Sequence, residues 1–150
     1  MLLIIDVNCI SKVLCDAPSQ DFLPILNSLM EGKRRIVIGG KKLENELKKV
    51  SSVLVFLKNL DQAGRVLVLL DNRVDLEEKY VENSFNIKSD DPHILALARV
   101  SGARLLCSFD KFLHKDFCNK SILDKPRGRV YQSVKHEKLL RTVRDANGLP

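Results

Sequence analysis

The stretch Leu2-Leu3-Ile4-Ile5-Asp6 decides the fold that we predict, because four consecutive apolar residues are followed at once by a carboxylate. A short run of this kind is typical of a strand that is buried on both faces of a parallel sheet. Three further short and mostly apolar runs follow, over 35–38, 66–70 and 104–107. Because helix-spaced segments separate these runs, we predict a three-layer α/β/α fold with a central, mostly parallel sheet.

The segments between the runs show helical spacing. Helices are predicted up to Cys15, over 21–30, through the periodic apolar positions from Leu43 to Leu57, over 76–85 and over 94–100. After a basic turn at 125–129, we predict a short strand at 130–131 and a last helix over about 134–145.

The composition is that of one globular domain. The 150 residues are 45% apolar and 29% charged, which excludes disordered and fibrous classes. No window approaches the roughly 18 to 20 apolar residues of a membrane span, and Met1 is not followed by a basic leader. The four cysteines form no C-x-x-C pair and fit reduced thiols. We therefore expect a single cytoplasmic domain over 1–150 with no membrane partner.

The positive charge is concentrated at one end of the chain. Residues 1–110 carry 15 basic and 15 acidic side chains, whereas residues 111–150 carry 10 basic and 4 acidic ones, the whole net charge of +6. We expect a core over about 1–117 and a basic C-terminal extension over about 121–150. Such a stretch indicates either a nucleic-acid partner or a solvated surface.

Two aspartates lie just beyond the ends of predicted strands. Asp6 comes after the first run and Asp110 comes shortly after the fourth. In parallel sheets ligands bind beyond the carboxyl ends of the strands, so both side chains are predicted to project from that edge. Either residue alone could simply begin a turn.

Helical periodicity separates Glu44 from Glu46. Glu46 lies one turn from both Leu43 and Val50, inside the apolar stripe, whereas Glu44 lies about 120° from the stripe's centre. A carboxylate on the core side of a helix is costly unless it is paired, hydrogen-bonded or bound to a metal. Glu46 is therefore a candidate ligand or a rim carboxylate bonded to a donor, and Glu44 is predicted to be a surface residue.

The stretch Ser89-Asp90-Asp91-Pro92 is a helix-start signal. Pro92 fits the first helical position, which makes Asp91 the natural N-cap without any chemical role. The same helix start can bring the Asp91 carboxylate to the carboxyl edge of the sheet.

The four carboxylates Asp6, Glu46, Asp91 and Asp110 could thus meet in one place. Like charges at close range raise one another's pKa, and a divalent cation relieves that repulsion. Oxygen ligands without His or Cys favour Mg²⁺ or Mn²⁺ over Zn²⁺. Beside a basic surface, such a site points to phosphate-ester hydrolysis through metal-activated water.

The order of these motifs resembles that of PIN-domain nucleases. The resembling stretches, in order over residues 1 to about 117, are Leu2–Asn8, Leu43–Leu47, Asp90–Ala98 and Leu105–Asp110. The resemblance implies a PIN-like α/β/α fold, with Asp6, Glu46, Asp91 and Asp110 as catalytic metal ligands. It assigns supporting positions to Asn8, Ser108 and Asp90, the last of which could exchange roles with Asp91.

The resemblance further implies a Mg²⁺- or Mn²⁺-dependent endoribonuclease acting on single-stranded or structured RNA, often the toxin of a toxin–antitoxin pair. It leaves open an antitoxin partner and a homodimer. We predict RNA-backbone contacts from Lys111, Lys115, Arg127 and Arg129. RNA bases could stack on Phe109, Phe112 or Tyr131 unless these rings belong to the core.

Two other readings remain open. The fold could serve as a non-catalytic RNA-binding or protein-docking module, although four costly carboxylates in one place count against that. An aspartyl-nucleophile phosphatase would need a second carboxylate at position 8, where the chain has Asn8. The Gly39-Gly40-Lys41-Lys42 stretch is too short for a phosphate-binding P-loop.

Overall fold

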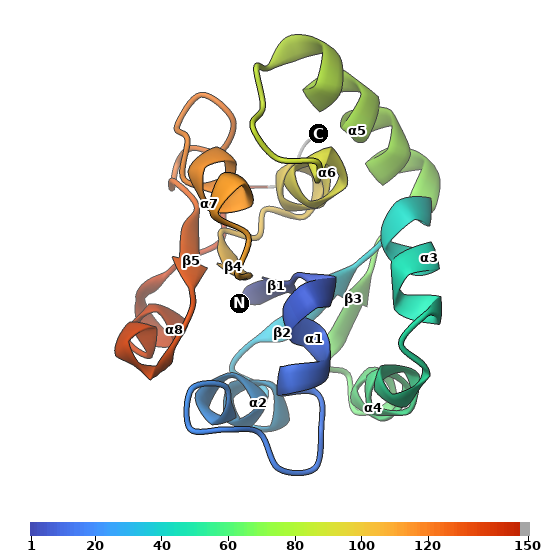
Figure 1. Cartoon of the computed structure of the whole chain (residues 1–150), viewed down its shortest axis with the longest axis vertical. Helices are drawn as coiled ribbons and strands as arrows, with labels where there is room; N and C mark the ends of the chain where they lie inside the picture. The colour runs from blue at the N-terminus through green and yellow to red at the C-terminus, as the bar shows by residue number, and fades with distance from the viewer. Residues whose placement is uncertain (148–150) are drawn as a thin grey trace.

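The structure is a computed structural model and describes residues 1–147. Within them, five strands form one sheet in the order β3-β2-β1-β4-β5, and every neighbouring pair is parallel. The strands are β1 (Leu2–Ile5), β2 (Arg35–Ile38), β3 (Val66–Val68), β4 (Leu105–Cys107) and β5 (Arg129–Tyr131). Helices flank this sheet (Figure 1), so the predicted three-layer α/β/α architecture is confirmed.

Eight α-helices and one 3₁₀-helix cover the sheet in the described part of the chain. They are α1 (Val7–Val13), α2 (Leu23–Met30), α3 (Lys41–Lys48), α4 (Ser51–Gln62), α5 (Asp71–Ser84), α6 (Pro92–Ser101), α7 (Lys111–Phe117), η1 (Val134–His136) and α8 (Leu139–Thr142). Helix α6 is buried continuously from Pro92 to Ala98, as its nearly unbroken apolar sequence requires.

The predicted helix through 43–57 is two helices. Leu43 and Leu47 of α3 and Val53 and Leu57 of α4 all enter the core, whereas Leu54, which belongs to the predicted apolar stripe, is 40% exposed. Between the two helices, Val50 leaves the helical conformation with φ −119° and ψ 71°. Neither Pro nor Gly marks this break, and periodicity alone therefore predicted one helix where there are two.

Two other predicted boundaries are also wrong. Strand β3 ends at Val68, two residues early, and α5 begins at Asp71 rather than at Leu76. The predicted last helix over 134–145 is reduced to η1 and the single turn of α8.

Buried Arg34 explains how the C-terminal segment is held without a longer helix. Its guanidinium donates to the carbonyl oxygens of Leu139, Leu140 and Val143, and to that of Leu2 in β1. The bonds to Leu140 and Val143 satisfy carbonyls that further helical turns would otherwise use. The C-terminal segment is thereby fixed to the first strand.

The sheet topology defines where a ligand can bind. The chain adds β2 and β3 on one side of β1, and then β4 and β5 on the other. The strand order therefore reverses between β1 and β4, and parallel sheets bind ligands in the crevice beyond the carboxyl ends at such a point. Residues 6 and 108–110 follow these two strands. Among the described residues, no helix is long and apolar enough to cross a bilayer.

Candidate functional site

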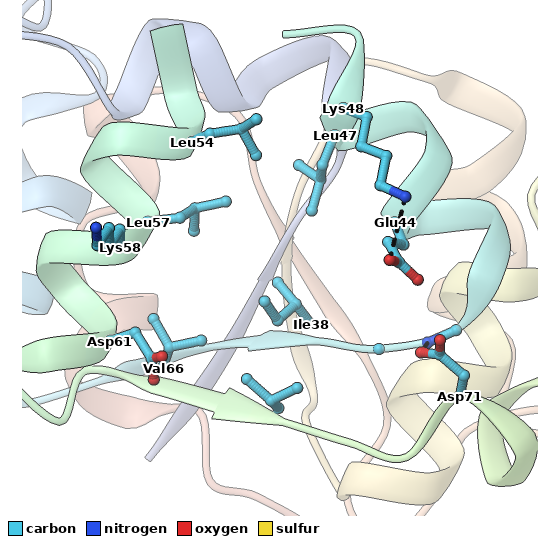
Figure 2. A pocket seen from close by; sticks show the side chains of 13 residues that line it. Ile38, Glu44, Leu47, Lys48, Leu54, Leu57, Lys58, Asp61, Val66 and Asp71 are labelled. Atoms are coloured by element: carbon cyan, nitrogen blue, oxygen red, sulfur yellow. Dashed lines mark hydrogen bonds and ion pairs between the residues drawn. The ribbon is translucent and has the colours of Figure 1, made fainter. Parts of the chain in front are cut away.

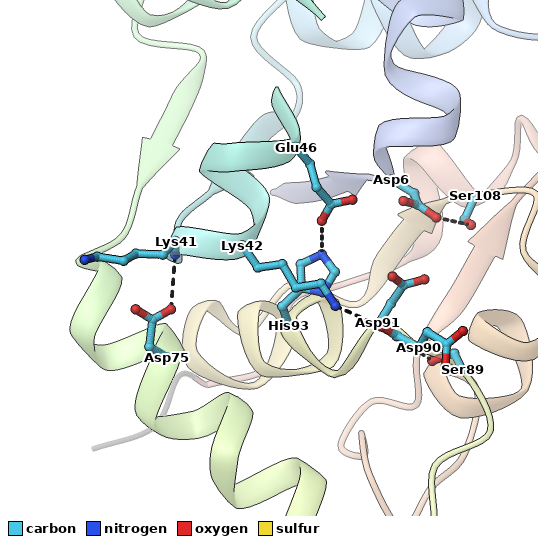
Figure 3. A network of polar contacts seen from close by, with 10 residues as sticks. All are labelled: Asp6, Lys41, Lys42, Glu46, Asp75, Ser89, Asp90, Asp91, His93 and Ser108. Carbon is cyan, nitrogen blue, oxygen red and sulfur yellow. Dashed lines mark hydrogen bonds and ion pairs between the residues drawn. The ribbon is translucent and has the colours of Figure 1, made fainter. Parts of the chain in front are cut away.

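Asp6 lies in the crevice between β1 and β4 and is 5% exposed. Its Oδ2 accepts a hydrogen bond of 2.7 Å from the hydroxyl of buried Ser108 (Figure 3). Burial raises the pKa of Asp6, and the charge of Asp110 adds to that rise. The Ser108 hydroxyl and the backbone amides of Val7 and Asn8 act in the opposite direction. Asn8 thus acts on Asp6 through its backbone, and its own side chain is exposed.

The two glutamates of α3 face different surroundings. Glu44 is exposed, pairs with Lys48 at 3.4 Å, and lines an apolar groove of about 590 Å³ between α3, α4 and β3 (Figure 2). Glu46 is half-buried on another face of the helix, where burial and the charge of Asp6 raise its pKa. The predicted separation of the two residues by helical angle agrees with this arrangement.

His93 of α6 is the partner of Glu46 and was not singled out from the sequence. Its Nε2 lies 2.7 Å from Glu46 Oε1, without the alignment of a hydrogen bond (Figure 3). The carboxylate would favour a charged ring, but burial and the charge of Lys42 dominate and lower the pKa of His93 to about 4. We therefore treat the ring as neutral. Glu46 Oε1 and His93 Nδ1 are buried without a hydrogen-bond partner in the described part of the chain.

Asp91 occupies the N-cap position of α6, but its side chain makes no capping bond. Its carboxylate instead faces the other acidic residues (Figure 3). Burial raises its pKa to about 6, and the charges of Asp6, Asp110 and Glu46 contribute in that order. The sequence-based prediction that the Asp91 side chain caps α6 is therefore wrong. The Asp91 carboxylate makes no capping hydrogen bond and is free to bind a ligand.

Asp110, in contrast, caps a helix. Its Oδ1 accepts from the backbone N–H groups of Phe112 at 2.9 Å and Leu113 at 3.2 Å, which begins α7. Its charge still acts on Asp6 and Asp91. Asp110 is thus near the other carboxylates while part of its bonding capacity is committed.

The loop that precedes α6 is fixed from α7. Buried Asp116 accepts from the backbone N–H of Lys88 with both carboxylate oxygens, at 3.0 Å each, and from that of Ser89 at 2.8 Å. The Ser89 hydroxyl in turn accepts from the Asp91 backbone N–H at 3.4 Å. Asp116 therefore positions Asp91 through Ser89, a contact that no local sequence pattern indicates.

Lys42 supplies positive charge at the rim of the site. Its Nζ donates to the backbone carbonyl of Asp90 at 3.1 Å (Figure 3). Its charge lowers the pKa of Glu46 and Asp91 against the effect of burial. The Asp90 side chain is exposed, so the structure favours Asp91 over Asp90 as the inward carboxylate.

The donor set fits a hard divalent cation in its chemistry. Burial raises the pKa of three carboxylates, at Asp6, Glu46 and Asp91, and the charge of at least one neighbouring carboxylate adds to each rise, which a bound cation would offset. Within residues 1–147, however, no three Asp, Glu, His or Cys side chains are close enough to form a ready-made metal site. Metal binding therefore stays a prediction.

The predicted nucleic-acid contacts fall into two groups. Lys111 and Lys115 are exposed on α7, the helix that begins at Asp110. Arg127 and Arg129 are exposed at the amino end of β5, away from the carboxyl edge of the sheet. Only the lysines belong to the helix that adjoins the carboxylates.

The three aromatic residues considered for base stacking also differ. Phe109 and Phe112 are 43% and 58% exposed, with the Nζ atoms of Lys12 and Lys115 at 5.9 and 6.0 Å from their respective ring centroids. Tyr131 is fully buried and donates to the carbonyl of Asp21. Tyr131 is therefore a core residue, whereas the two phenylalanines are accessible.

No protein-family model, curated protein or solved structure matches this chain.

Proposed function

We propose that this protein is a Mg²⁺- or Mn²⁺-dependent endoribonuclease with a PIN-like fold, acting in the cytoplasm. The observation that carries the proposal is the gathering of three carboxylates with raised pKa values at the switch point of a parallel sheet. Exposed lysines and phenylalanines on and beside α7 fit a single-stranded RNA substrate. A role as the toxin of a toxin–antitoxin pair and a homodimeric state belong to the same proposal.

Asp6, Glu46 and Asp91 would hold the cation, with Asp110 contributing its charge. A bound Mg²⁺ or Mn²⁺ ion supplies Lewis-acid chemistry, which lowers the pKa of an attacking water and offsets charge on the phosphodiester. The protein residues provide the orientation. Ser108 fixes one oxygen of Asp6.

Protonation of Asp91 links this site to pH. With a pKa of about 6, Asp91 holds a proton in part of the metal-free molecules at neutral pH. Cation binding requires the ionised carboxylate and releases that proton, so affinity for the cation rises with pH from about 5 to 7. Lys42 favours the ionised form and stands where a substrate phosphate would approach the rim.

Cleavage of a mixed-sequence, single-stranded RNA in Mn²⁺ or Mg²⁺ tests the proposal. We expect wild-type cleavage that EDTA abolishes and that Asp6→Asn and Glu46→Gln reduce by roughly 10²- to 10³-fold. Glu44→Gln is the matched control, since Glu44 lies on the same helix but is exposed and paired with Lys48. Folding of each variant is checked by circular dichroism. Equal losses from Glu44→Gln and Glu46→Gln would contradict the assigned site.

A non-catalytic RNA-binding module is the second candidate. One observation favours it, because the exposed side chains of Lys111, Lys115, Phe109 and Phe112 could contact RNA without any cleavage. RNA binding without cleavage in either metal would establish this alternative.

A further inference from the structure

A second cavity, of about 450 Å³, lies between α7, the edge strand β5 and the η1–α8 segment. Its lining includes three full cations, Arg129, Lys135 and Lys138. No Asp or Glu is among the described residues that line it, and Glu137 lines a different cavity next to α2. The cavity is therefore a concave surface with charge of one sign, which concentrates anions.

The three cations have no anionic partner within residues 1–147. None of Arg129, Lys135 and Lys138 belongs to an ion pair there, whereas Lys33, Lys48 and Arg99 elsewhere on the molecule do. All three residues are exposed. Their charges are consequently available to an external ligand.

Two histidines shape one wall of the cavity. His114 Nε2 contacts the carbonyl oxygen of Ser108, which can only accept, so Nε2 carries the proton. Its Nδ1 then accepts from the Gln132 side-chain amide at 3.2 Å. His136 Nδ1 accepts from the Gln132 backbone N–H at 3.0 Å, and its ring packs edge-on against Tyr131. In this arrangement the Nε2–H of His136 remains as a neutral donor.

Cys118 also lines the cavity, and its thiol does not change the positive charge of the lining. Burial raises the pKa of its thiol, against the effect of Arg127 and Arg129, so the sulfur stays protonated. A soft metal cation would find one neutral thiol and three positive charges here. The chemistry of the lining fits an oxyanion with several acceptor oxygens, such as a phosphate group.

The cavity is connected to the carboxylate site by one residue. Ser108 bonds to His114 through its carbonyl and to Asp6 through its hydroxyl. The edge strand β5 and the carboxyl end of β4 are thus held together at the start of α7. An extended polyanion that reaches the carboxylates can continue along α7 into the cationic cavity.

We propose that this cavity binds a backbone phosphate of a single-stranded polynucleotide, next to the phosphodiester held at the carboxylate site. The inference rests on the proposed nuclease function and assigns the C-terminal extension a substrate-binding role. It involves Lys135 and Lys138, which charge distribution alone did not single out from the other basic residues of the extension.

The test is equilibrium binding of a fluorescein-labelled RNA dodecamer in EDTA, measured by fluorescence anisotropy at several salt concentrations. We expect Lys135→Ala/Lys138→Ala to bind about tenfold more weakly than wild type at low salt. The slope of log K against log salt is expected to fall by about 0.7 to 1.4, which corresponds to one or two phosphate contacts on a single strand. The matched control is Lys58→Ala/Lys79→Ala, which removes the same charge from exposed positions on α4 and α5.

If the two double variants weakened RNA binding equally, the proposed phosphate site in the cavity would be overturned, and only a general effect of positive charge would remain. Inorganic phosphate that shifts the His136 ring resonances, in protein that does not bind the dodecamer, would also overturn the inference, because the site would then take small anions only. Because binding is measured in EDTA, failure of the nuclease proposal is seen separately. If the protein never cleaves RNA but Lys135→Ala/Lys138→Ala selectively weakens RNA binding, the phosphate site in the cavity would be supported and the nuclease function would not.

Discussion

The starts of α6 and α7 carry the same residue in the same position with opposite outcomes. Asp91 and Asp110 are both N-cap residues. The Asp110 carboxylate bonds two backbone N–H groups of its helix, whereas the Asp91 carboxylate bonds none. At α6 the Ile94 N–H is taken by the backbone carbonyl of Asp91 at 3.1 Å, so the side chain is not needed there.

This difference separates a structural carboxylate from a reactive one. A capping carboxylate is stabilised by the N–H groups of its helix. A free carboxylate held among Asp6 and Glu46 raises the free energy of the folded, metal-free state, as the raised pKa of Asp91 indicates. The arrangement is favourable once a cation is present, which is why α6 rather than α7 presents the better candidate ligand.

The largest effect expected from this comparison concerns cleavage. Asp91→Asn removes a free ligand and is expected to reduce Mn²⁺-dependent RNA cleavage by roughly 10²- to 10³-fold. Asp110→Asn keeps a capping oxygen and removes only a charge, so a loss of about tenfold is expected. Initial cleavage rates at saturating Mn²⁺ measure both. A greater loss from Asp110→Asn than from Asp91→Asn would reverse the assignment.

Asp116 is expected to give the next largest effect. Asp116→Ala leaves the Lys88 and Ser89 N–H groups without their carboxylate, which costs about 2 to 4 kcal/mol in the free energy of unfolding. Urea denaturation of the metal-free protein measures this loss.

A separate readout distinguishes positioning from stability alone. Because Asp116 holds the loop in front of α6, the Mn²⁺ concentration for half-maximal cleavage is expected to rise in Asp116→Asn, which keeps one acceptor oxygen. Asp124→Asn is the control, since Asp124 is exposed and contributes no bond to this loop. An unchanged Mn²⁺ requirement in folded Asp116→Asn would contradict its positioning role.

The centre of the sheet could be predicted because β1 and β4 are buried on both faces. The run 2–5 is uninterrupted and apolar, the run 35–38 is apolar after Arg35, and the structure gives both strands these bounds. Periodicity also places Glu46 toward the interior and Glu44 outside, since the angle between them around one helix is fixed by geometry. Predictions of this kind depend only on local spacing.

The remaining features depend on contacts between distant parts of the chain. The sequence indicates side-chain capping by Asp91, whereas in the structure Asp110 caps with its side chain and Asp91 does not. Backbone dihedral angles and competing acceptors, rather than residue type, decide which aspartate caps. His93 reaches Glu46 only because α6 packs beside α3, and Asp116 reaches Lys88 across a separation of 28 residues. None of these pairs leaves a signal in either segment alone.

Capping itself gives a smaller effect. Asp110→Ala removes two hydrogen bonds at the start of α7 and is expected to lower the free energy of unfolding by about 1 to 2 kcal/mol. Asp110→Asn, which caps as well as aspartate, is expected to change it by only a few tenths of a kcal/mol. Asp91→Ala is expected to cause no loss in metal-free protein. A comparable loss from Asp91→Ala would remove the distinction between the two helix starts.

The smallest effect is the pH dependence of the Asp91 charge. Because its pKa is raised from 3.8 to about 6 on folding, the folded protein binds more protons than the unfolded chain between these values. The Asp91 carboxylate therefore does not lower the free energy of unfolding below pH 3.8. Its destabilising effect grows as the pH rises to about 6 and is constant above that pH.

Metal-free Asp91→Asn is accordingly expected to match wild type near pH 3.5 and to exceed it by up to about 1 kcal/mol above pH 6, after allowance for solvent screening. The lowered pKa of His93 acts in the opposite direction over the same interval, but it is present in both proteins and cancels from their difference. Urea denaturation in EDTA between pH 3.5 and 7.5 measures that difference. Asp90→Asn, one residue away and exposed, is the control and is expected to show no such growth. A constant difference across this range would mean that neither burial nor the charges of its neighbours acts on the Asp91 carboxylate, and the contrast between α6 and α7 would lose its electrostatic basis.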